Sequence, residues 1–557
     1  MSARPAPSAL GWRGWLGLAA ALFVLNLSLS FQQLAPTPFV TLGHQLSVEI
    51  AVLVLGLALW RGLAGPPPAA LLAVLAVVLT LLALGRYALV AVAGLLGRPL
   101  SLVWDLPHLP NVVAMLVETM PGWATAATAA GVLVLPLLVY APLRWALGRV
   151  RLALEPPRLR RALGAGAAGL LLVYLVGPLS PSGASERWFA EPVSTAFAEQ
   201  ARGWQAARSG GGPSLAQAPE QRSDLARLGG AHLVVLFLES YGAVVYDRPG
   251  LHERLAPARE GLSRALAETG REAVSALVHA PTYGGYSWLS HASLLVGIEV
   301  RDNDAYAQLL TEERETLVHR FARQGYRPLA MMPGLREDWP EGAFYGFAEI
   351  YGVRDLDYRG PELGWWRIPD QFAAARLREL ELASDDGVPR FVFFPTISTH
   401  APFRPTPPYE PDWTRVLAET PYDEEAIAAA LAVRPNFKDL TLDYADAMAY
   451  AFDWLAGWLR QAAGDELVLL IVGDHQPPAS VGGREASNEV PVHLITDRRE
   501  LLDALLAEGF RPGLTPERPA LAAMHELHAL LLRAFDSGRE RLAREAGVDV
   551  PRARPAR

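Results

Sequence analysis

The chain has 557 residues, too many for one ordinary domain, and no cysteine, which excludes disulfides, thiolate metal sites and a cysteine nucleophile. Its net charge of -8, with no basic stripe interleaved with aromatic side chains, gives no reason to expect nucleic acid as a partner. Hydrophobic residues make up 51% of the chain, and their excess is concentrated before about residue 180. We therefore expect an apolar membrane domain followed by a polar domain.

Five apolar segments in the first part of the chain are candidates to cross a bilayer, which takes about 20 helical residues. They cover residues 12–30, 48–63, 69–96, 123–143 and 163–179. A cleaved signal peptide is the alternative for the first segment, and the four segments that follow count against it. The sequence thus predicts a transmembrane domain of five spans over residues 1–180.

Arginine placement predicts the orientation of these spans. The loop between the first two segments, residues 31–47, has no lysine or arginine. The loop between the last two carries Arg144, Arg149, Arg151, Arg158, Arg160 and Arg161. By the positive-inside rule this basic loop is cytoplasmic, and an odd number of spans then puts everything after the fifth outside. We expect a multi-pass protein of the bacterial cytoplasmic (inner) membrane with its polar domain on the periplasmic or extracellular side.

After a predicted surface linker over 181–229, short apolar runs alternate with amphipathic stretches. The predicted strands are 232–238, 273–279, 328–332, 390–395, 467–472 and 490–495. The predicted helices include 254–269, 288–296, 317–324, 371–382, 440–463 and 519–535. This alternation favours an α/β domain with a mostly parallel central sheet over 230–537. The charged tail, 538–557, is expected to be disordered.

Two of the predicted strands end in polar residues that suit a metal ion. Glu239 follows the strand 232–238, and Asp474 and His475 follow the strand 467–472 after Gly473. Because the carboxyl ends of parallel strands share one edge of a sheet, these three side chains are expected to meet there. The alternative is that Asp474 caps a following helix and His475 is a surface residue.

A third motif, residues 281–291 (PTYGGYSWLSH), follows a strand and opens a helix. Its two glycines allow a close backbone approach, and Ser287 is expected at the helix N-terminus, where free N–H groups favour an anion. A serine hydroxyl becomes a good nucleophile when a divalent cation coordinates it. The alternative is that Ser287 only caps the helix.

In this order, the three motifs resemble the alkaline phosphatase/sulfatase superfamily. Together with a five-span anchor they look like its lipoteichoic acid synthase and phosphoglycerol transferase group. Two further segments fit: residues 396–403 (TISTHAPF), and residues 344–352 (FYGFAEIYG) preceded by Arg336. The resemblance covers nearly the whole chain, and it implies that an α/β sulfatase-like domain follows the membrane domain.

The resemblance also implies the roles of individual residues. Glu239, Asp474 and His475 would bind one divalent metal ion, with Ser287 as fourth ligand and nucleophile. Arg336 and His400 would hold the substrate phosphate, and His400 could protonate a leaving alcohol. We take Mn²⁺ as the preferred ion. The donor set of three oxygens and one imidazole nitrogen also suits Mg²⁺ or Zn²⁺ and does not choose between them.

The chain departs from that group in three ways. Ser287 stands where the group has threonine, and Thr282, which precedes the glycine turn, is the alternative nucleophile. The tryptophan before the phosphate-binding arginine is absent, which leaves recognition of glycerol phosphate open. Sulfatases need a C/S-x-P-x-R motif, and residues 287–291 lack both the proline and the arginine, so hydrolysis of sulfate esters is not expected.

His291 lies four residues after Ser287 and so on the same face of the predicted helix. It is either a packed core histidine or a residue that supports the substrate site.

The expected function is that of a membrane-anchored, metal-dependent phosphotransferase. It would move a phosphoglycerol-type headgroup from a membrane phospholipid to a cell-envelope glycan or glycolipid through a phospho-serine intermediate. A phosphoethanolamine transferase and a phosphodiesterase or other hydrolase with the same site are alternatives. A non-catalytic membrane scaffold is a third, which the complete set of Glu239, Ser287, Asp474 and His475 argues against.

Overall fold

The computed structural model describes residues 11–33, 39–96, 100–177, 188–209, 215–218, 221–364, 366–483 and 486–538. The chain divides into two compact units, 1–209 and 210–557. This boundary lies within the predicted linker 181–229, because the helix α9 (Val193–Ser209) belongs to the first unit. The predicted tail lies outside the described residues except for Gly538.

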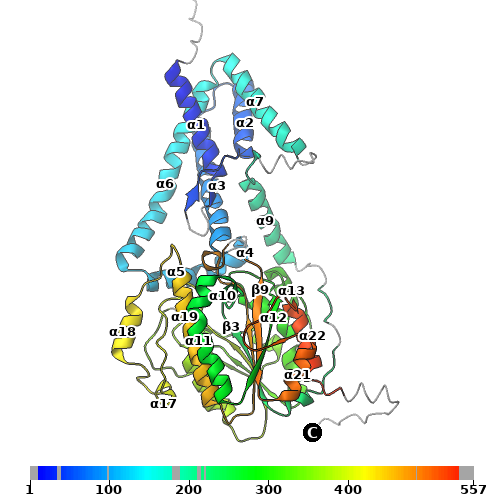
Figure 1. Cartoon of the computed structure of the whole chain (residues 1–557). Helices are drawn as coiled ribbons and strands as arrows, with labels where there is room; N and C mark the ends of the chain where they lie inside the picture. Colours follow the sequence, from blue (N-terminus) through cyan, green and yellow to red (C-terminus); the bar gives the residue numbers. More distant parts are fainter. Residues whose placement is uncertain are drawn as a thin grey trace, which may run out of the picture. The chain divides into compact units, whose positions relative to one another are not determined.

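The first unit is helical (Figure 1), and each of the five predicted spans forms a helix. The helices are α1 (Trp12–Ser30), α2 (Val48–Leu63), α3 (Ala69–Leu96), α4 (Leu102–Asp105), α5 (Leu109–Thr119), α6 (Gly122–Ala153), α7 (Pro157–Val176) and α9. Of these, α1, α3, α6 and α7 are long and apolar enough to cross a membrane. The helix α2 has 16 residues, fewer than the usual 20 or so. Four of the five predicted spans therefore meet this criterion of length and composition.

Both ends of α2 coincide with the ends of its neighbours. At its start, the Ser47 backbone N–H donates to Asn26 Oδ1 over 2.8 Å, and Asn26 lies in the last turns of α1. In its last turn, Arg61 pairs with Glu155 at 2.7 Å, in the turn between α6 and α7. The helix therefore runs antiparallel to α1, from the end where α1 finishes to the end where α6 meets α7.

The second unit is built on a nine-stranded sheet with the order β10-β4-β9-β8-β3-β7-β5-β6 and with β11 paired to β4. The strands are β3 (His232–Leu238), β4 (Glu272–His279), β5 (Arg327–Met331), β6 (Glu349–Tyr351), β7 (Arg390–Pro395), β8 (Leu467–Gly473), β9 (Glu489–Thr496), β10 (Arg511–Pro512) and β11 (Ala522–Ala523). The strands β8, β3, β7, β5 and β6 run parallel, and β9 is antiparallel to both β8 and β4. The predicted mostly parallel sheet is thus confirmed.

Helices cover both faces of this sheet because its buried strands are apolar on both sides. In β3, Val234, Leu236 and Leu238 face one core, which is shared with α11 (Pro249–Glu268), α16 (Asp370–Leu377) and α19 (Thr441–Gln461). Residues Leu233, Val235 and Phe237 face the other core, with α12 (Ser287–Val296), α14 (Leu317–Arg323), α21 (Arg499–Ala507) and α22 (Met524–Phe535). Figure 1 shows α11 and α19 on one side of the sheet and α12 and α22 on the other.

All six predicted strands are present, with ends shifted by at most one residue. The predicted helix 519–535 is wrong at its start, because the Leu521 N–H donates to Leu277 O over 2.7 Å and residues 522–523 pair with β4 instead. The predicted helix 371–382 is α16 followed by a π-helical turn, Arg378–Leu382. The strands β6, β10 and β11 were not predicted, since two or three residues are too few to show a period.

Candidate metal centre and active site

The carboxyl ends of β3 and β8 bring together the three predicted metal ligands. The two strands are parallel neighbours with Leu238 opposite Gly473, so the residues that follow them start side by side. Possible ligand atoms of Glu239, Asp474 and His475 all lie within 4.8 Å of one another, and all three side chains are buried. This register alone places two carboxylates and one imidazole at one point of the sheet edge.

The tautomer of His475 suits a metal ligand. Its Nδ1 lies 2.8 Å from the Gln476 carbonyl oxygen, which can only accept, so Nδ1 carries the proton. In the neutral ring Nε2 then has a free electron pair. This atom lies 3.4 Å from Glu239 Oε1 and 3.6 Å from Asp474 Oδ2. A carbonyl that fixes the ring in this way is common behind metal-bound histidines.

Asp474 supplies an oxygen that no protein group satisfies. Its Oδ1 accepts from the backbone N–H groups of Ser240 and His475, each over 2.7 Å. Its Oδ2 is buried and has no hydrogen-bond partner in the described protein. Burial, and then the charge of Glu239, raises the pKa of Asp474 to about 7. Two carboxylates buried this close are unfavourable without a cation, so the residues fit a divalent metal ion.

Ser287 is the first residue of α12, and its hydroxyl reaches this cluster. Its Oγ donates to Glu239 Oε2 over 3.0 Å and lies 3.1 Å from His475 Nε2. The preceding residue, Tyr286, has a left-handed backbone with a φ of 62°, which is unusual for a side chain of this size. The Gly284 N–H donates to Gln476 O over 3.2 Å and ties the turn to the Asp474 segment. The strained turn therefore aims Ser287 at the carboxylates.

Thr282 and His291 have different surroundings from Ser287. Thr282 Oγ1 donates to Gly285 O over 2.7 Å, so its hydroxyl closes the glycine turn. The ring of His291 packs against the rings of Phe237 and Phe393, with centroids 4.4 and 5.2 Å away. Burial lowers the pKa of His291 to about 4, so this side chain is neutral. The geometry favours a packed histidine under the cluster over a substrate contact.

His400 belongs to a segment that is bonded to the backbone of Glu239. Thr396 Oγ1 accepts from the Glu239 N–H over 3.0 Å, and Thr399 Oγ1 donates to Glu239 O over 2.7 Å. His400 Nδ1 donates to Ala401 O over 2.7 Å, which leaves the second ring nitrogen unprotonated in the neutral form. Burial lowers the pKa of His400, and the charges of His475 and Asp474 act on it as well. His400 thus lies close enough to the cluster for the charges of His475 and Asp474 to affect its pKa.

Arg336 lies in the loop after β5, at the same edge of the sheet. It is half-buried. A Cβ built on Gly334 in this loop would come within 3.2 Å of Ile397, so the loop packs against the segment that carries His400. The absence of a side chain at Gly334 permits this close packing.

Asp370 is a site residue that the sequence reasoning missed. It is fully buried at the start of α16, and its two oxygens accept from the N–H groups of Ile397 and Ser398, each over 2.9 Å. Its own N–H donates to Ser398 Oγ over 3.1 Å. Burial raises the pKa of Asp370 to about 6. The available signal was an aspartate at the start of a predicted helix, which usually indicates a cap.

Gly473 and Gln476 hold the segment of Asp474 and His475 in place. A Cβ on Gly473 would lie 1.9 Å from Tyr241 O, so only glycine lets β8 end this close to the turn after β3. The Gln476 amide donates to the carbonyls of Ser487 and Glu489, each over 2.9 Å. These contacts hold the segment after Asp474 and His475 against the start of β9.

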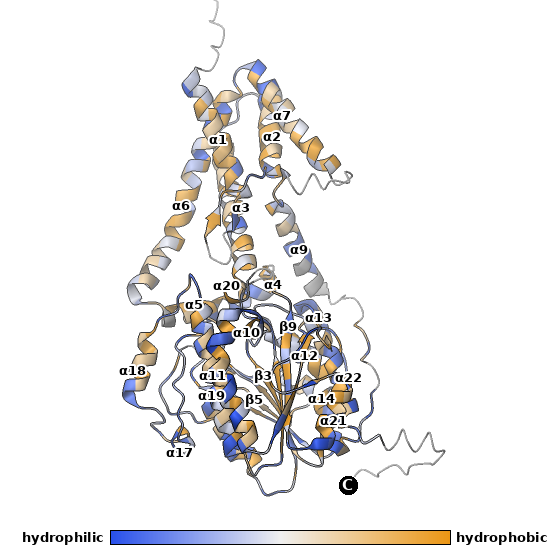
Figure 2. Ribbon diagram, viewed as in Figure 1, coloured by the Kyte–Doolittle hydropathy of each residue, from blue (hydrophilic) through white to orange (hydrophobic). Residues whose placement is uncertain are grey.

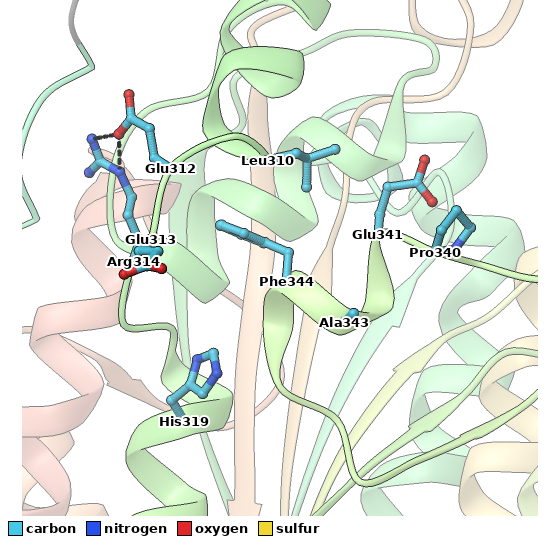
Figure 3. Close-up of a pocket in the computed structure, with 9 residues that line it drawn as sticks. All are labelled: Leu310, Glu312, Glu313, Arg314, His319, Pro340, Glu341, Ala343 and Phe344. Atoms are coloured by element: carbon cyan, nitrogen blue, oxygen red, sulfur yellow. Dashed lines mark hydrogen bonds and ion pairs between the residues drawn. The ribbon is translucent and has the colours of Figure 1, made fainter.

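A separate cavity of about 640 Å³ lies beside α14 and α15 (Gly342–Tyr345), as Figure 3 shows. It is lined by Leu310, Glu312, Glu313, Arg314, His319, Pro340, Glu341, Ala343 and Phe344. Arg314 pairs with Glu312 in its wall at 2.6 Å. None of the predicted site residues lines this cavity.

The matched family agrees with the geometry of this unit. The Sulfatase family model matches residues 233–494, a span that contains every predicted site residue. We name residues 233–494 the Sulfatase-family domain after this match. This confirms the resemblance to the alkaline phosphatase/sulfatase superfamily that the motifs indicate.

Several solved structures are similar to the chain at low identity. The phosphoethanolamine transferase EptA from Neisseria meningitidis is 13% identical, with a TM-score of 0.47, over 96% of this chain and 97% of that one. The lipoteichoic acid synthase LtaP from Listeria monocytogenes is 11% identical, with a TM-score of 0.35, over 58% and 81%. The phosphoglycerol transferase GacH from Streptococcus pyogenes is 13% identical, with a TM-score of 0.35, over 61% and 82%. Comparison with curated proteins gives no match.

The candidate metal cluster of the Sulfatase-family domain predicts the effect of removing a ligand. Changing Asp474→Asn or Glu239→Gln keeps the size of the side chain but removes an anionic donor, so affinity for a divalent ion is expected to fall by at least about 100-fold. Elemental analysis and titration of the melting temperature with Mn²⁺, Mg²⁺ and Zn²⁺ measure this. In the unchanged protein, ion at 100 times Kd should add about 2.7 kcal/mol of stability.

The control for these variants is Asp453→Asn, which removes a half-buried carboxylate of α19 outside the cluster. It should keep the metal content of the unchanged protein. Full metal content in Asp474→Asn and Glu239→Gln would contradict the assignment of the cluster.

Asp370→Asn is expected to lower kcat by about 10- to 100-fold while the bound metal stays constant. The new amide group would face a backbone N–H of Ile397 or Ser398, which loosens the segment that carries His400. Steady-state kinetics together with elemental analysis separate the two effects. Asp412→Asn, an exposed cap of the helix Trp413–Val416, is the matched control. An unchanged kcat in Asp370→Asn would show that the segment holds His400 without this carboxylate.

Proposed function

We propose that this protein is a membrane-anchored, metal-dependent phosphotransferase that uses Ser287 as its nucleophile. The observation that carries the proposal is the contact of the Ser287 hydroxyl with both Glu239 and His475, within a Sulfatase-family domain. The domain lacks the C/S-x-P-x-R motif that sulfatases need, which directs the proposal to phosphate esters. In a purely structural scaffold, a buried carboxylate oxygen without a hydrogen-bond partner would only destabilise the fold.

The proposed reaction has two displacements at phosphorus. First, the bond from Ser287 Oγ to phosphorus forms and the bond from phosphorus to the lipid alcohol breaks. Ser287 loses one proton in this step, and the leaving alcohol gains one. A neutral His400 can pass that proton on, because one ring nitrogen is protonated and the other is not. In the second displacement an acceptor hydroxyl attacks phosphorus, and Ser287 regains its proton.

Glu239, Asp474, His475 and Ser287 would hold the metal ion, for which Mn²⁺ is the first candidate and Mg²⁺ or Zn²⁺ the alternatives. The ion would lower the pKa of the Ser287 hydroxyl and offset negative charge at the phosphate. Arg336 would pair with two phosphate oxygens through its guanidinium group. His291 would support the cluster by packing beneath it.

We propose a phosphoglycerol-type headgroup, with a membrane phospholipid as donor and a cell-envelope glycan or glycolipid as acceptor. The order of the motifs supports this choice, whereas the absence of the tryptophan before Arg336 favours testing phosphoethanolamine beside it. Hydrolysis is the outcome if water replaces the acceptor. A donor labelled in its headgroup distinguishes all three products.

We further propose that the Sulfatase-family domain lies outside the cytoplasmic membrane. The chain changes sides in α2, since the two ends of this helix meet opposite ends of its neighbours. Sixteen residues rise about 24 Å, which suits a bilayer core that is slightly thinned at a short helix. Counting α2 gives five crossings, so the domain lies opposite to the arginine-rich turn between α6 and α7.

Ser287→Ala is expected to lower headgroup transfer by four or more orders of magnitude, because the nucleophile is lost. Transfer from headgroup-labelled phosphatidylglycerol and phosphatidylethanolamine is the measurement, and mass spectrometry of the unchanged protein should find the headgroup phosphate on Ser287. Thr282→Ala is the matched control and should keep most activity. Retained transfer in Ser287→Ala with loss in Thr282→Ala would move the nucleophile to Thr282.

The proposed topology can be read from single cysteines, because the chain has none of its own. A cysteine at Arg158, in the first turn of α7, is expected to react with a membrane-impermeant thiol reagent only after cells are opened. A cysteine at Val388, which is exposed on the Sulfatase-family domain, is expected to react from outside. The same accessibility at both positions would mean that α2 does not cross.

A further inference from the structure

An exposed apolar segment lies at the edge of the sheet that carries the metal cluster. In the described part of the second unit, six large apolar side chains are exposed, and four of them fall within residues 431–442. These are Leu431, Val433, Phe437 and Leu442, with exposed fractions of 41, 44, 40 and 59%. Such a concentration in twelve residues differs from the scattered apolar exposure of an ordinary surface.

The helix that leads into this segment is also apolar and uncovered. The helix α18 (Glu424–Ala432, EEAIAAALA) has no buried residue, and Figure 2 colours much of it as hydrophobic. An amphipathic helix normally buries its apolar face against its own domain. Here that face continues into residues 431–442 without a partner in the described second unit. Together they form one exposed apolar surface, which we call the docking segment (residues 424–442).

The exposed part of this segment is held in a defined shape. Leu440 is buried, and the Asn436 N–H donates to Asp443 Oδ2 over 2.8 Å. Asp443 in turn pairs with Arg404 at 2.8 Å. The Thr441 N–H donates to Asp439 Oδ1 over 3.0 Å and starts α19. Phe437 and its neighbours are therefore exposed by a fixed loop.

The segment is close to the active site because α19 begins at the same edge. Tyr444, in the first turn of α19, donates through its hydroxyl to Ser240 O over 2.9 Å, and Ser240 is the residue after Glu239. The other two exposed apolar side chains, Leu380 and Val388, precede β7 and so lie toward the amino ends of the parallel strands. Four of the six exposed apolar side chains are thus found toward the sheet edge that carries the cluster.

The cations of the docking segment lie beside its exposed apolar side chains. Residues 431–442 contain Arg434 and Lys438 with one carboxylate, Asp439, a net charge of +1, whereas Glu424 and Glu425 in the first turn of α18 bring the whole segment, 424–442, to -1. Lys438 is the only lysine of the chain. Asp439 is turned to the start of α19, where it accepts from Thr441. Exposed leucine, valine and phenylalanine beside basic residues are typical of segments that insert into the interface of a membrane.

We propose that the docking segment inserts its apolar side chains into the outer surface of the membrane in which the chain is anchored, with the metal cluster facing the lipid headgroups. This deepens the proposed function and rests on it for the identity of the substrate. Apolar insertion and attraction to anionic headgroups would act together with the membrane helices that already hold the domain at the bilayer.

The test uses the full chain with a single cysteine introduced as Phe437→Cys and coupled to a fluorophore that reports polarity. In vesicles of phosphatidylethanolamine and phosphatidylglycerol, we expect emission at a shorter wavelength and quenching by nitroxide-labelled lipid. Val388→Cys, also exposed and apolar, is the matched control and should show neither change. Emission at 437 that matches 388 would overturn the proposal. So would a shift that depends on protein concentration in detergent without quenching by lipid, which would mean a second copy covers the segment.

A second variant separates docking from chemistry. Phe437→Glu combined with Leu442→Glu changes two exposed positions, so the fold should persist. We expect a lower rate with phospholipid in vesicles and an unchanged rate with a soluble aryl phosphodiester. Equal rates with vesicle lipid for the variant and the unchanged protein would overturn the proposal. Failure of the proposed function would look different, since neither substrate would react while the label at 437 was still quenched.

Discussion

Two carboxylates buried at one point of a sheet edge are the constraint on which the rest of this domain depends. Glu239 and Asp474 follow adjacent parallel strands whose register sets Leu238 opposite Gly473. At this depth their mutual repulsion is large, and Asp474 has an oxygen that no protein group satisfies. A bound cation would offset this repulsion, and His475 presents an unprotonated nitrogen to the same point. The cluster therefore fits a metal ion before any reaction is considered.

The neighbouring segments hold these carboxylates in place through backbone bonds. Thr396 and Thr399 bond the N–H and carbonyl of Glu239, so the segment of His400 moves with the ligand. Asp370 bonds the same segment from the other side and so links α16 to the cluster. His400 and Glu239 are thus parts of one hydrogen-bonded network.

Much of this arrangement could be predicted from the sequence because it follows from local patterns. Long apolar runs gave the strands that end at Glu239 and Asp474, and the glycine pair before Ser287 gave the turn. Asp370 could not be found in the same way, since its partners at 397 and 398 are distant in sequence and bond through backbone atoms. The role of Gly473 was hidden for a similar reason, because it depends on the close approach of Tyr241. The short strand β11 replaced the start of a predicted helix because a tertiary pairing with β4 outweighed local preference.

A tether and a weak apolar surface together can orient an active site that neither could orient alone. A single short hydrophobic anchor binds a bilayer with an association constant of about 10⁴ M⁻¹. A tether of short, flexible chain holds its partner at an effective concentration of about 1 mM. The product is about 10, so a surface as modest as residues 431–442 would be inserted most of the time. The active-site edge would then face the headgroups for most of that time, whereas a tether alone would leave it free to rotate. At micromolar concentration a soluble form of the same domain would be docked about 1% of the time, about a hundredfold less, so the proposed docking depends on the membrane helices as a tether.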